Sequence, residues 1–222
     1  MSTIIKGKFN CPHCQKEFES DMYKVIDISE NKEYRTRFIN SDFFKYTCPH
    51  CGKTFAAFYP VLYIDHSNKF MVQYTPKEMF DEMLKIVKAN GEKLKSNYTL
   101  RMCETVYDAV EKVIVLENRL DDRALECSKV IIHKSYLEKF KDKRVHHIYF
   151  NVDEKHNFYY DVLVLNDDNT KMPVRANFDF NLYNTIYKDF RREFKDDDYV
   201  VDYGYGLRMM KKGPNNINGK AS

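Results

Sequence analysis

The sequence has no tryptophan, no hydrophobic run long enough to cross a membrane, and no large excess of charge of either sign. A membrane span needs about 20 consecutive apolar residues, and the opening MSTIIKGKFNCP lacks the apolar core of a secretory signal peptide. A net charge of +3 is too small to argue for nucleic acid, a membrane surface or an acidic substrate. We therefore expect a cytoplasmic protein without a membrane partner.

Signatures of catalysis are also missing. The sequence contains no glycine-rich phosphate loop, no G-x-S-x-G, no H-E-x-x-H, and no convincing cysteine–histidine dyad outside one repeated motif. What is present is an ordinary folded composition, with 43% hydrophobic and 31% charged residues. The 17 Tyr and 16 Phe favour cores and sheet faces. We therefore expect a folded protein that is not an enzyme.

Cysteine is scarce, at six residues, yet four of the six belong to one motif that occurs twice. CPHCQKEF at residues 11–18 and CPHCGKTF at residues 48–55 are nearly identical. In a reducing compartment, paired cysteines indicate metal binding or redox chemistry rather than disulfides. A thioredoxin-like redox site needs a single C-x-x-C at the start of a helix, and neither pair stands there.

Four thiolates make up the tetrahedral shell that Zn²⁺ prefers, and two intervening residues let one tight turn aim both sulfurs at the same ion. We predict one zinc ion per chain, with the ligands Cys11, Cys14, Cys48 and Cys51. A closed shell has no position for water or substrate, so this zinc would be structural. An iron centre stays open as an alternative, because sulfur ligation alone does not select the metal.

The two copies differ at the residue after the second cysteine. Gly52 tolerates the positive φ of such a turn, whereas Gln15 stands at the equivalent place in the first copy. We expect the first turn to be less relaxed, with metal binding retained. The remaining cysteines are expected in the core and the histidines of the motif on the surface, away from the metal: Cys103, Cys127, His13 and His50.

Residue patterns predict an α+β fold. Short, antiparallel β runs form a four-cysteine zinc ribbon at 7–75, including a hairpin over residues 55–76. Within it, the polar stretch SENKEYRTRFINSDFF is expected to be a surface excursion or a pair of edge strands. Residues 75–140 are predicted to be helical, with Gly91 ending the first helix and the apolar stripe from Met102 lying in the next.

The C-terminal region, 145–210, is predicted to return to strands. VHHIYFNV and FYYDVLVLN form a hairpin, KMPVRANF adds a third strand, and NLYNTIYKDFRREF forms an amphipathic helix. The acidic run KDDDYVVDYGYG is expected to be a turn into a last strand. The tail 211–222 is polar and is predicted to be disordered.

Other polar groups are weaker candidates for sites. Asp121 is predicted to cap a helix, and two neighbouring helices carry residues that pair locally or form a buried ion network, structural or functional: Arg101, Asp108, Glu111, Lys112, Asp122 and Arg123. A second metal held by His146, His147 and His156 is disfavoured, because adjacent residues on a strand point to opposite faces.

The doubled CPHC, the following YPVLYID and the TP that opens the next helix resemble the CpXC family, named for this cysteine motif. The similarity extends through LRMCETVYDAVEKVIVLENRLDDRALECSKV, so it covers roughly residues 7–132. It implies a bacterial or archaeal domain of unknown function at 7–140, with a zinc ribbon at 7–75 and a helical part at 75–140. The resemblance implies the fold and the four ligands, but no activity.

Two functions follow as expectations. The first is a non-catalytic interaction module, in which the zinc ribbon presents a fixed surface to a protein partner. The alternative is a nucleic-acid-binding zinc ribbon, because NKEYRTRF mixes aromatic residues with Lys32, Arg35 and Arg37. Glu30 and Glu33 dilute that basic patch.

Overall fold

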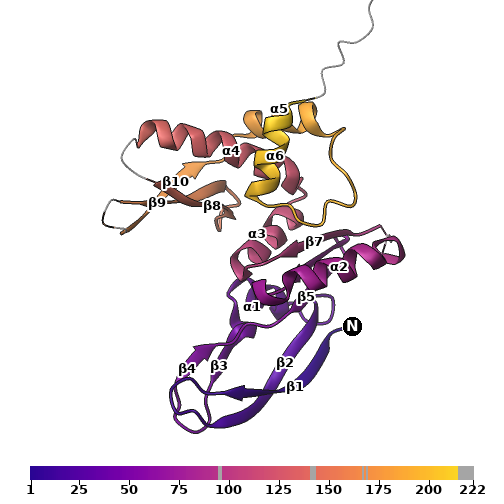
Figure 1. Ribbon diagram of the computed structural model, residues 1–222, viewed down its shortest axis with the longest axis vertical. Helices are drawn as coiled ribbons and strands as arrows, with labels where there is room; N and C mark the ends of the chain where they lie inside the picture. Colours follow the sequence, from indigo (N-terminus) through magenta and orange to yellow (C-terminus); the bar gives the residue numbers. More distant parts are fainter. Residues whose placement is uncertain (95–96, 141–143, 167, 169, 215–222) are drawn as a thin grey trace, which may run out of the picture. The chain divides into compact units, whose positions relative to one another are not determined.

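The computed structural model describes residues 1–94, 97–140, 144–166, 168 and 170–214 (Figure 1). The chain is a mixed α+β protein, as predicted, and divides into two compact units, Met1–Val110 and Glu111–Ser222. The sequence predicted domains at 7–140 and 145–210 from the cysteine motif and the pattern of helices and strands. Compact units are defined differently, so these domains stay a prediction.

The first unit is built on a five-stranded sheet of order β1-β2-β5-β6-β7. Its strands are β1 (Thr3–Asn10), β2 (Glu17–Asp27), β5 (Val61–Asp65), β6 (Phe70–Tyr74) and β7 (Thr99–Cys103). The expected antiparallel pairs are present as β1-β2 and as the predicted hairpin β5-β6. Two parallel pairs, β2-β5 and β6-β7, join these hairpins and the last strand into one sheet.

Strand β7 corrects the helical prediction for residues 99–103. Its last four residues are all buried, and Cys103 lies there rather than on a helix. A short, continuously buried run cannot be assigned to strand or helix from periodicity alone. The helix that carries the predicted apolar stripe starts later, as α3 (Val106–Glu117), and α2 (Lys77–Leu94) continues past Gly91.

The polar stretch after β2 is also different from the prediction. It forms α1 (Glu33–Ile39) and the 3-10 turn η1 (Asp42–Phe44), which bury Phe38, Phe43 and Phe44. Phe38 packs on Tyr63 of the sheet, with ring centroids 4.8 Å apart. Three buried rings thus fold a segment whose average composition is that of a surface loop. The chain then enters a separate two-stranded sheet, β3 (Lys45–Thr47) and β4 (Thr54–Ala56).

The second unit contains an antiparallel sheet of order β10-β9-β8, which confirms the predicted hairpin and third strand. The strands are β8 (Arg144–Val152), β9 (Phe158–Leu165) and β10 (Lys171–Asn177). Its helices are α4 (Asp122–Lys139), the predicted α5 (Phe180–Phe190) and α6 (Tyr203–Lys212). Asp121 caps α4 as predicted, by accepting a hydrogen bond from the Arg123 backbone N–H at 3.0 Å.

Helix α6 stands where a last strand was predicted. Asp202 caps it, and its Tyr205, Gly206 and Met209 are buried. A Cβ on Gly206 would come within 2.4 Å of the Glu126 carbonyl oxygen, so only glycine allows α6 to lie this close to α4. The predicted disordered tail, 211–222, begins inside α6; residues 215–222 lie outside the described residues. Within the described chain, no helix combines the length and apolarity of a membrane span.

Candidate metal centre

Both cysteine pairs lie at the tips of hairpins in the first unit. Cys11 and Cys14 lie between β1 and β2, and Cys48 and Cys51 lie between β3 and β4. The two turns have the same backbone hydrogen bonds. In the first turn, the Gln15 backbone N–H donates to the Cys11 carbonyl at 2.8 Å. In the second turn, the Gly52 N–H donates to the Cys48 carbonyl at 2.9 Å. The Cys11 N–H donates to the Lys16 carbonyl at 3.1 Å, and the Cys48 N–H donates to the Lys53 carbonyl at 3.0 Å.

The turns also share a left-handed residue after the second cysteine. Gly52 has a φ of +70°, and Gln15 has a φ of +60°. Glycine adopts this conformation without penalty, whereas a residue with a Cβ does so at a cost of about 1–2 kcal/mol. The first turn therefore has the same shape as the second. As predicted, it is the less relaxed of the two, because Gln15 is held in a left-handed conformation.

The four sulfurs converge. The Sγ atoms of Cys11 and Cys51 are 3.7 Å apart, as are those of Cys14 and Cys48, and all four lie within 4.8 Å of one another. A tetrahedral ion with Zn–S bonds of about 2.3 Å requires sulfur separations of about 3.8 Å. We call these four residues the cysteine cluster; in the described part of the chain, no other set of three His, Cys, Asp or Glu side chains gathers closely enough to hold a metal.

The cluster is buried on one side. Cys11 and Cys48 are buried, Cys14 is half-buried and Cys51 is exposed. Burial raises the pKa of the Cys11 thiol, but hydrogen bonds from the backbone N–H groups of Cys14 and His13 and from the other thiols outweigh it, lowering the pKa to about 7. The Lys53 N–H lowers the pKa of Cys51, but burial and the neighbouring thiols raise it to about 11. A bound cation would favour the thiolate at every position.

Aromatic rings connect the hairpins beneath the cluster. Phe9 of β1 packs on Tyr46 of β3 with ring centroids 4.2 Å apart, and Phe18 of β2 packs edge-on against Phe55 of β4 at 6.1 Å. The Tyr46 hydroxyl donates to the Tyr59 hydroxyl at 2.9 Å. These rings pack where the two hairpins meet, directly beneath the tips that carry the four thiols.

The other residues of the motif lie where the sequence predicts. His13 and His50 are exposed, and the His50 Nε2 atom lies 3.2 Å from the carbonyl oxygen of Glu17. Cys103 and Cys127 are buried. Burial raises the pKa of the Cys127 thiol to about 12, consistent with a core residue rather than a ligand.

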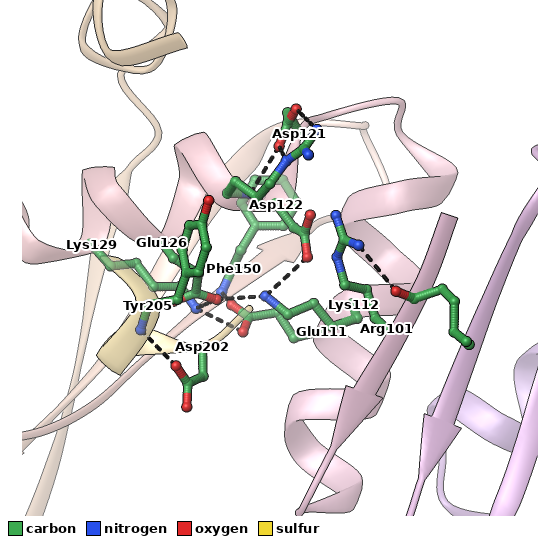
Figure 2. Close-up of polar contacts among 12 residues, drawn as sticks. Arg101, Glu111, Lys112, Asp121, Asp122, Glu126, Lys129, Phe150, Asp202 and Tyr205 are labelled. Carbon is green, nitrogen blue, oxygen red and sulfur yellow. Dashed lines mark hydrogen bonds and ion pairs between the residues drawn. The ribbon is translucent and has the colours of Figure 1, made fainter. Parts of the chain in front are cut away.

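A second polar group lies in the second unit and is shown in Figure 2. It joins α3 to α4 through two lysines and three acids, each at most 4% exposed, and we call it the charge cluster: Glu111, Lys112, Asp122, Glu126 and Lys129. Lys112 Nζ lies 2.7 Å from Glu126 Oε1 and 3.5 Å from Asp122 Oδ2. Lys129 Nζ lies 2.7 Å from Glu111 Oε2 and 3.1 Å from Glu126 Oε1.

The charges of this cluster compensate one another at close range. Burial raises the pKa of Glu111, against the effect of Lys129. For Glu126, the attraction of Lys112 and Lys129 exceeds the effect of burial and lowers the pKa. Glu111 also accepts a hydrogen bond from the Phe150 backbone N–H, and Glu126 Oε2 has no hydrogen-bond partner among the described residues. The cluster is therefore a network that holds α3, α4 and β8 together.

The sequence located part of this network. Glu111, Lys112 and Asp122 belong to it, and the predicted buried ion network across two helices is present. Glu126 and Lys129 were missed, although with Asp122 they repeat at i, i+4 and i+7 on one face of α4.

Three other residues that the sequence grouped with the network have contacts of their own. Asp108 accepts a hydrogen bond from the Thr105 hydroxyl at 2.7 Å, and Arg123 pairs with Asp121 at 2.7 Å. Arg101 lies in β7 of the first unit, where its Nη1 atom donates to the Leu100 carbonyl at 3.0 Å. His146 and His147 lie at an irregularity of β8 with ring centroids 4.1 Å apart, and His156 lies in the turn to β9.

A comparison with known protein families finds a match over the first part of the chain. The CpXC family, described as CpXC protein, matches residues 9–129, a span that contains both cysteine pairs and all five residues of the charge cluster. No curated protein and no solved structure matches the chain. Because the match covers more than half of the sequence, the chain belongs to the CpXC family.

Proposed function

We propose that the cysteine cluster binds one structural Zn²⁺ and that the protein is a non-catalytic interaction module of the cytoplasm. The observation that carries the metal assignment is the convergence of four sulfurs within 4.8 Å, with two separations of 3.7 Å. Cys11, Cys14, Cys48 and Cys51 would hold the ion, which supplies a positive charge and four fixed bonds in place of a hydrophobic core. A reducing cytoplasm keeps such thiols available to the metal.

The donor set supports a structural role for the ion. Four thiolates fill the tetrahedral shell, which leaves no position for water or substrate. Cys11 and Cys48 are buried, and the aromatic rings beneath the hairpins depend on the same two tips being held together. Metal binding in sites of this kind supplies about 10–16 kcal/mol of folding free energy at neutral pH.

The substitution Cys48→Ser tests the assignment. It removes a buried ligand, so we expect the zinc content, measured by elemental analysis, to fall from one ion per chain to near zero. We also expect residues 7–75 to lose their protection from hydrogen exchange. Cys127→Ala is the matched control, because it removes a buried thiol outside the cluster and should leave the zinc content unchanged. A Cys48→Ser protein that still carries one zinc per chain would contradict the proposal.

The interaction surface that we propose for a protein partner is the outer edge of β1. This strand stands at the end of the five-stranded sheet and pairs with β2 alone among the described strands. It exposes Ile4 at 46% and Ile5 at 43%. An edge strand with exposed apolar residues is a template for adding an extended peptide from another chain. Both β1 and β10 carry two basic residues, but β10 also carries Pro173, which lacks the N–H needed for pairing and protects that edge, whereas β1 has no proline.

Affinity purification of the native chain and of Ile5→Lys tests this surface. We expect a protein retained by the native chain to be lost from Ile5→Lys, with the zinc content of both chains unchanged. Lys6→Met, at the neighbouring exposed position, is the control and should keep the partner. Equal recovery of the partner with Ile5→Lys would exclude the β1 edge.

Nucleic-acid binding is the alternative function. Arg37 lies over the rings of Phe43 and Tyr23, at 4.2 and 5.2 Å; because Phe43 is buried, a base would stack on the half-buried guanidinium rather than on that ring. If this alternative holds, single-stranded nucleic acid is retained at low salt and lost steeply as the salt concentration rises. Failure to bind heparin or nucleic acid at low salt would remove the alternative.

A further inference from the structure

A second group of reactive side chains lies in the first unit, at the end of β2 opposite the cysteines. Asp27 ends β2, His66 follows β5, and Tyr98 directly precedes β7. The C-terminal ends of the parallel strands β2 and β5 meet the N-terminal ends of β6 and β7, because β6 is antiparallel to β5 and parallel to β7. The sheet topology therefore brings these three residues, distant in sequence, to one end of the sheet.

The three side chains form a continuous relay. Tyr98 Oη lies 2.6 Å from His66 Nδ1, and His66 Nε2 lies 3.0 Å from Asp27 Oδ2. Because a carboxylate can only accept, Nε2 carries the hydrogen of the neutral imidazole, and Nδ1 is left as an acceptor. The Tyr98 hydroxyl then donates to Nδ1. A phenol, a base and a carboxylate that orients the base thus follow in order.

The relay has one buried and one accessible end. The side chain of Asp27 is 3% exposed, whereas that of His66 is 46% exposed and the Tyr98–His66 hydrogen bond faces solvent. Burial raises the pKa of the Asp27 carboxyl, but hydrogen bonds from the amino group of Met1, from Ser29 and from His66 outweigh it and hold the pKa below its usual range. The carboxylate is therefore ionised at neutral pH and keeps the imidazole in one tautomer.

We propose that Tyr98 is a nucleophile activated by His66, with Asp27 as the residue that positions His66, and that the site takes an uncharged, activated acyl ester. A nucleophile within hydrogen-bond reach of a base, which a third group orients, is the arrangement of nucleophilic catalysis. Beside the relay, two carboxylates share one ammonium: the Met1 amino group lies 2.7 Å from Asp27 Oδ2 and 3.9 Å from Glu30 Oε1, which leaves one negative charge uncompensated. That charge disfavours an anionic phosphoryl donor and favours a neutral ester.

The chemical step balances without a cofactor. Tyr98 Oη attacks the ester carbonyl carbon, a new C–O bond forms, and the phenol proton moves to His66 Nδ1. When the bond to the leaving alcohol breaks, the imidazolium returns that proton to the departing oxygen. The products are an acyl-tyrosine and the free alcohol, and no atom changes oxidation state. The step ends at the acyl-tyrosine, so it is a single covalent modification of the chain rather than turnover; it goes beyond the proposed non-catalytic module and involves no residue of the cysteine cluster.

The second unit contains a natural comparison. The Tyr203 hydroxyl is also hydrogen-bonded to a histidine Nδ1 atom, that of His133 on α4. There the histidine has the Val145 backbone as its other partner, in place of a carboxylate, and burial lowers the pKa of His133. A tyrosine–histidine pair without an orienting carboxylate should be the weaker nucleophile.

The test uses the zinc-loaded full chain and p-nitrophenyl acetate. Peptide mass spectrometry follows acetylation of each tyrosine, and absorbance follows release of p-nitrophenolate. We expect Tyr98 to be acetylated before Tyr203. His66→Gln should slow acetylation of Tyr98 by about 100-fold, the usual contribution of a general base. Tyr98→Phe should remove the acetylated peptide.

Two measurements keep the outcome clear. His66 is half exposed, so His66→Gln should retain the native zinc content and hydrogen-exchange protection, which separates loss of the base from loss of the fold. Asp27→Asn should lower the rate less than His66→Gln and shift its pH profile. Acetylation of Tyr98 at the same rate as Tyr203, or a rate unchanged in folded His66→Gln, would overturn the proposal. Loss of zinc in Cys48→Ser tests the metal separately.

Discussion

The cysteine cluster and the charge cluster both bring together groups that are costly to bury, but they neutralise their charges differently. In the charge cluster, Lys112 and Lys129 each lie within 2.7 Å of a carboxylate oxygen, so attraction between the protein's own side chains offsets desolvation. In the cysteine cluster, four thiols face one another at 3.7–4.8 Å. Thiolates at these positions repel, and a cation is needed to hold them.

The difference distinguishes a structural network from a binding site. The charge cluster has two lysines for three carboxylates, and each lysine lies 2.7 Å from a carboxylate oxygen, so its own side chains supply most of the compensation that a bound cation would give. Ligands of one kind, aimed at a common centre and partly exposed at Cys51, are instead arranged for an ion. The largest predicted effects therefore come from the metal, and smaller ones from the paired charges and the turns.

Removal of the metal should produce the largest difference between the regions around the two clusters. With a chelator in excess, we expect residues 7–75 to lose hydrogen-exchange protection, because about 10–16 kcal/mol of binding free energy is lost. The charge cluster contains no metal ligand, so amides of α4 and β8 should stay protected. Hydrogen-exchange mass spectrometry measures both regions in one sample. Equal loss of protection in α4 would show that the two units do not behave separately.

Lys129→Met should have the next largest effect. It leaves Glu111 without its 2.7 Å partner in a buried site, and breaking a buried pair in this way costs about 3–5 kcal/mol. Denaturant unfolding gives the loss, and the zinc content should not change. Adding Glu111→Gln should recover part of the stability, because the amide oxygen can still accept from the Phe150 N–H. The exposed Lys134→Met on the same helix is the control, with a negligible effect.

The two cysteine turns offer the smallest and most closely matched test. Gln15→Gly should stabilise the zinc-loaded protein by about 1 kcal/mol, because it relieves a left-handed φ of +60°. Gly52→Gln should destabilise it by a similar amount. No atom lies within 4 Å of a Cβ built on Gly52, so backbone conformation rather than crowding is responsible. Denaturant unfolding at saturating zinc measures both; destabilisation by Gln15→Gly would show that φ is not the cause.

Prediction from the sequence succeeded where one signal determines the local structure. The doubled C-x-x-C located the four clustered cysteines, the strand patterns located the C-terminal hairpin, and Asp121 marked the start of α4. It failed where burial depends on distant segments. Phe38, Phe43 and Phe44 lie in a polar stretch, and only their contacts with the sheet make that stretch a helix and a turn. β7 is a strand because β6 is beside it.

Glycine and the charged residues of α4 show the same limit. The acidic, aromatic run KDDDYVVDYGYG predicted a turn and a last strand, but its Gly206 lies in a helix, where the backbone of α4 leaves no space for a side chain. Glu126 and Lys129 were not predicted to be buried, and they are buried beside the opposite charges of Lys112 and Glu111. A side chain's partner, rather than its own polarity, decides whether burial is tolerated.

By itself, the sequence determined the four cysteines that cluster, the α+β class and the family, because these depend on residue identity and short spacing. Only the tertiary structure decided how the two hairpin tips face one another, which charges pair in the buried cluster, and that Asp27, His66 and Tyr98 meet at one end of the sheet. These arrangements join segments tens of residues apart. Their free energy comes from packing and desolvation, which no local pattern of the chain contains.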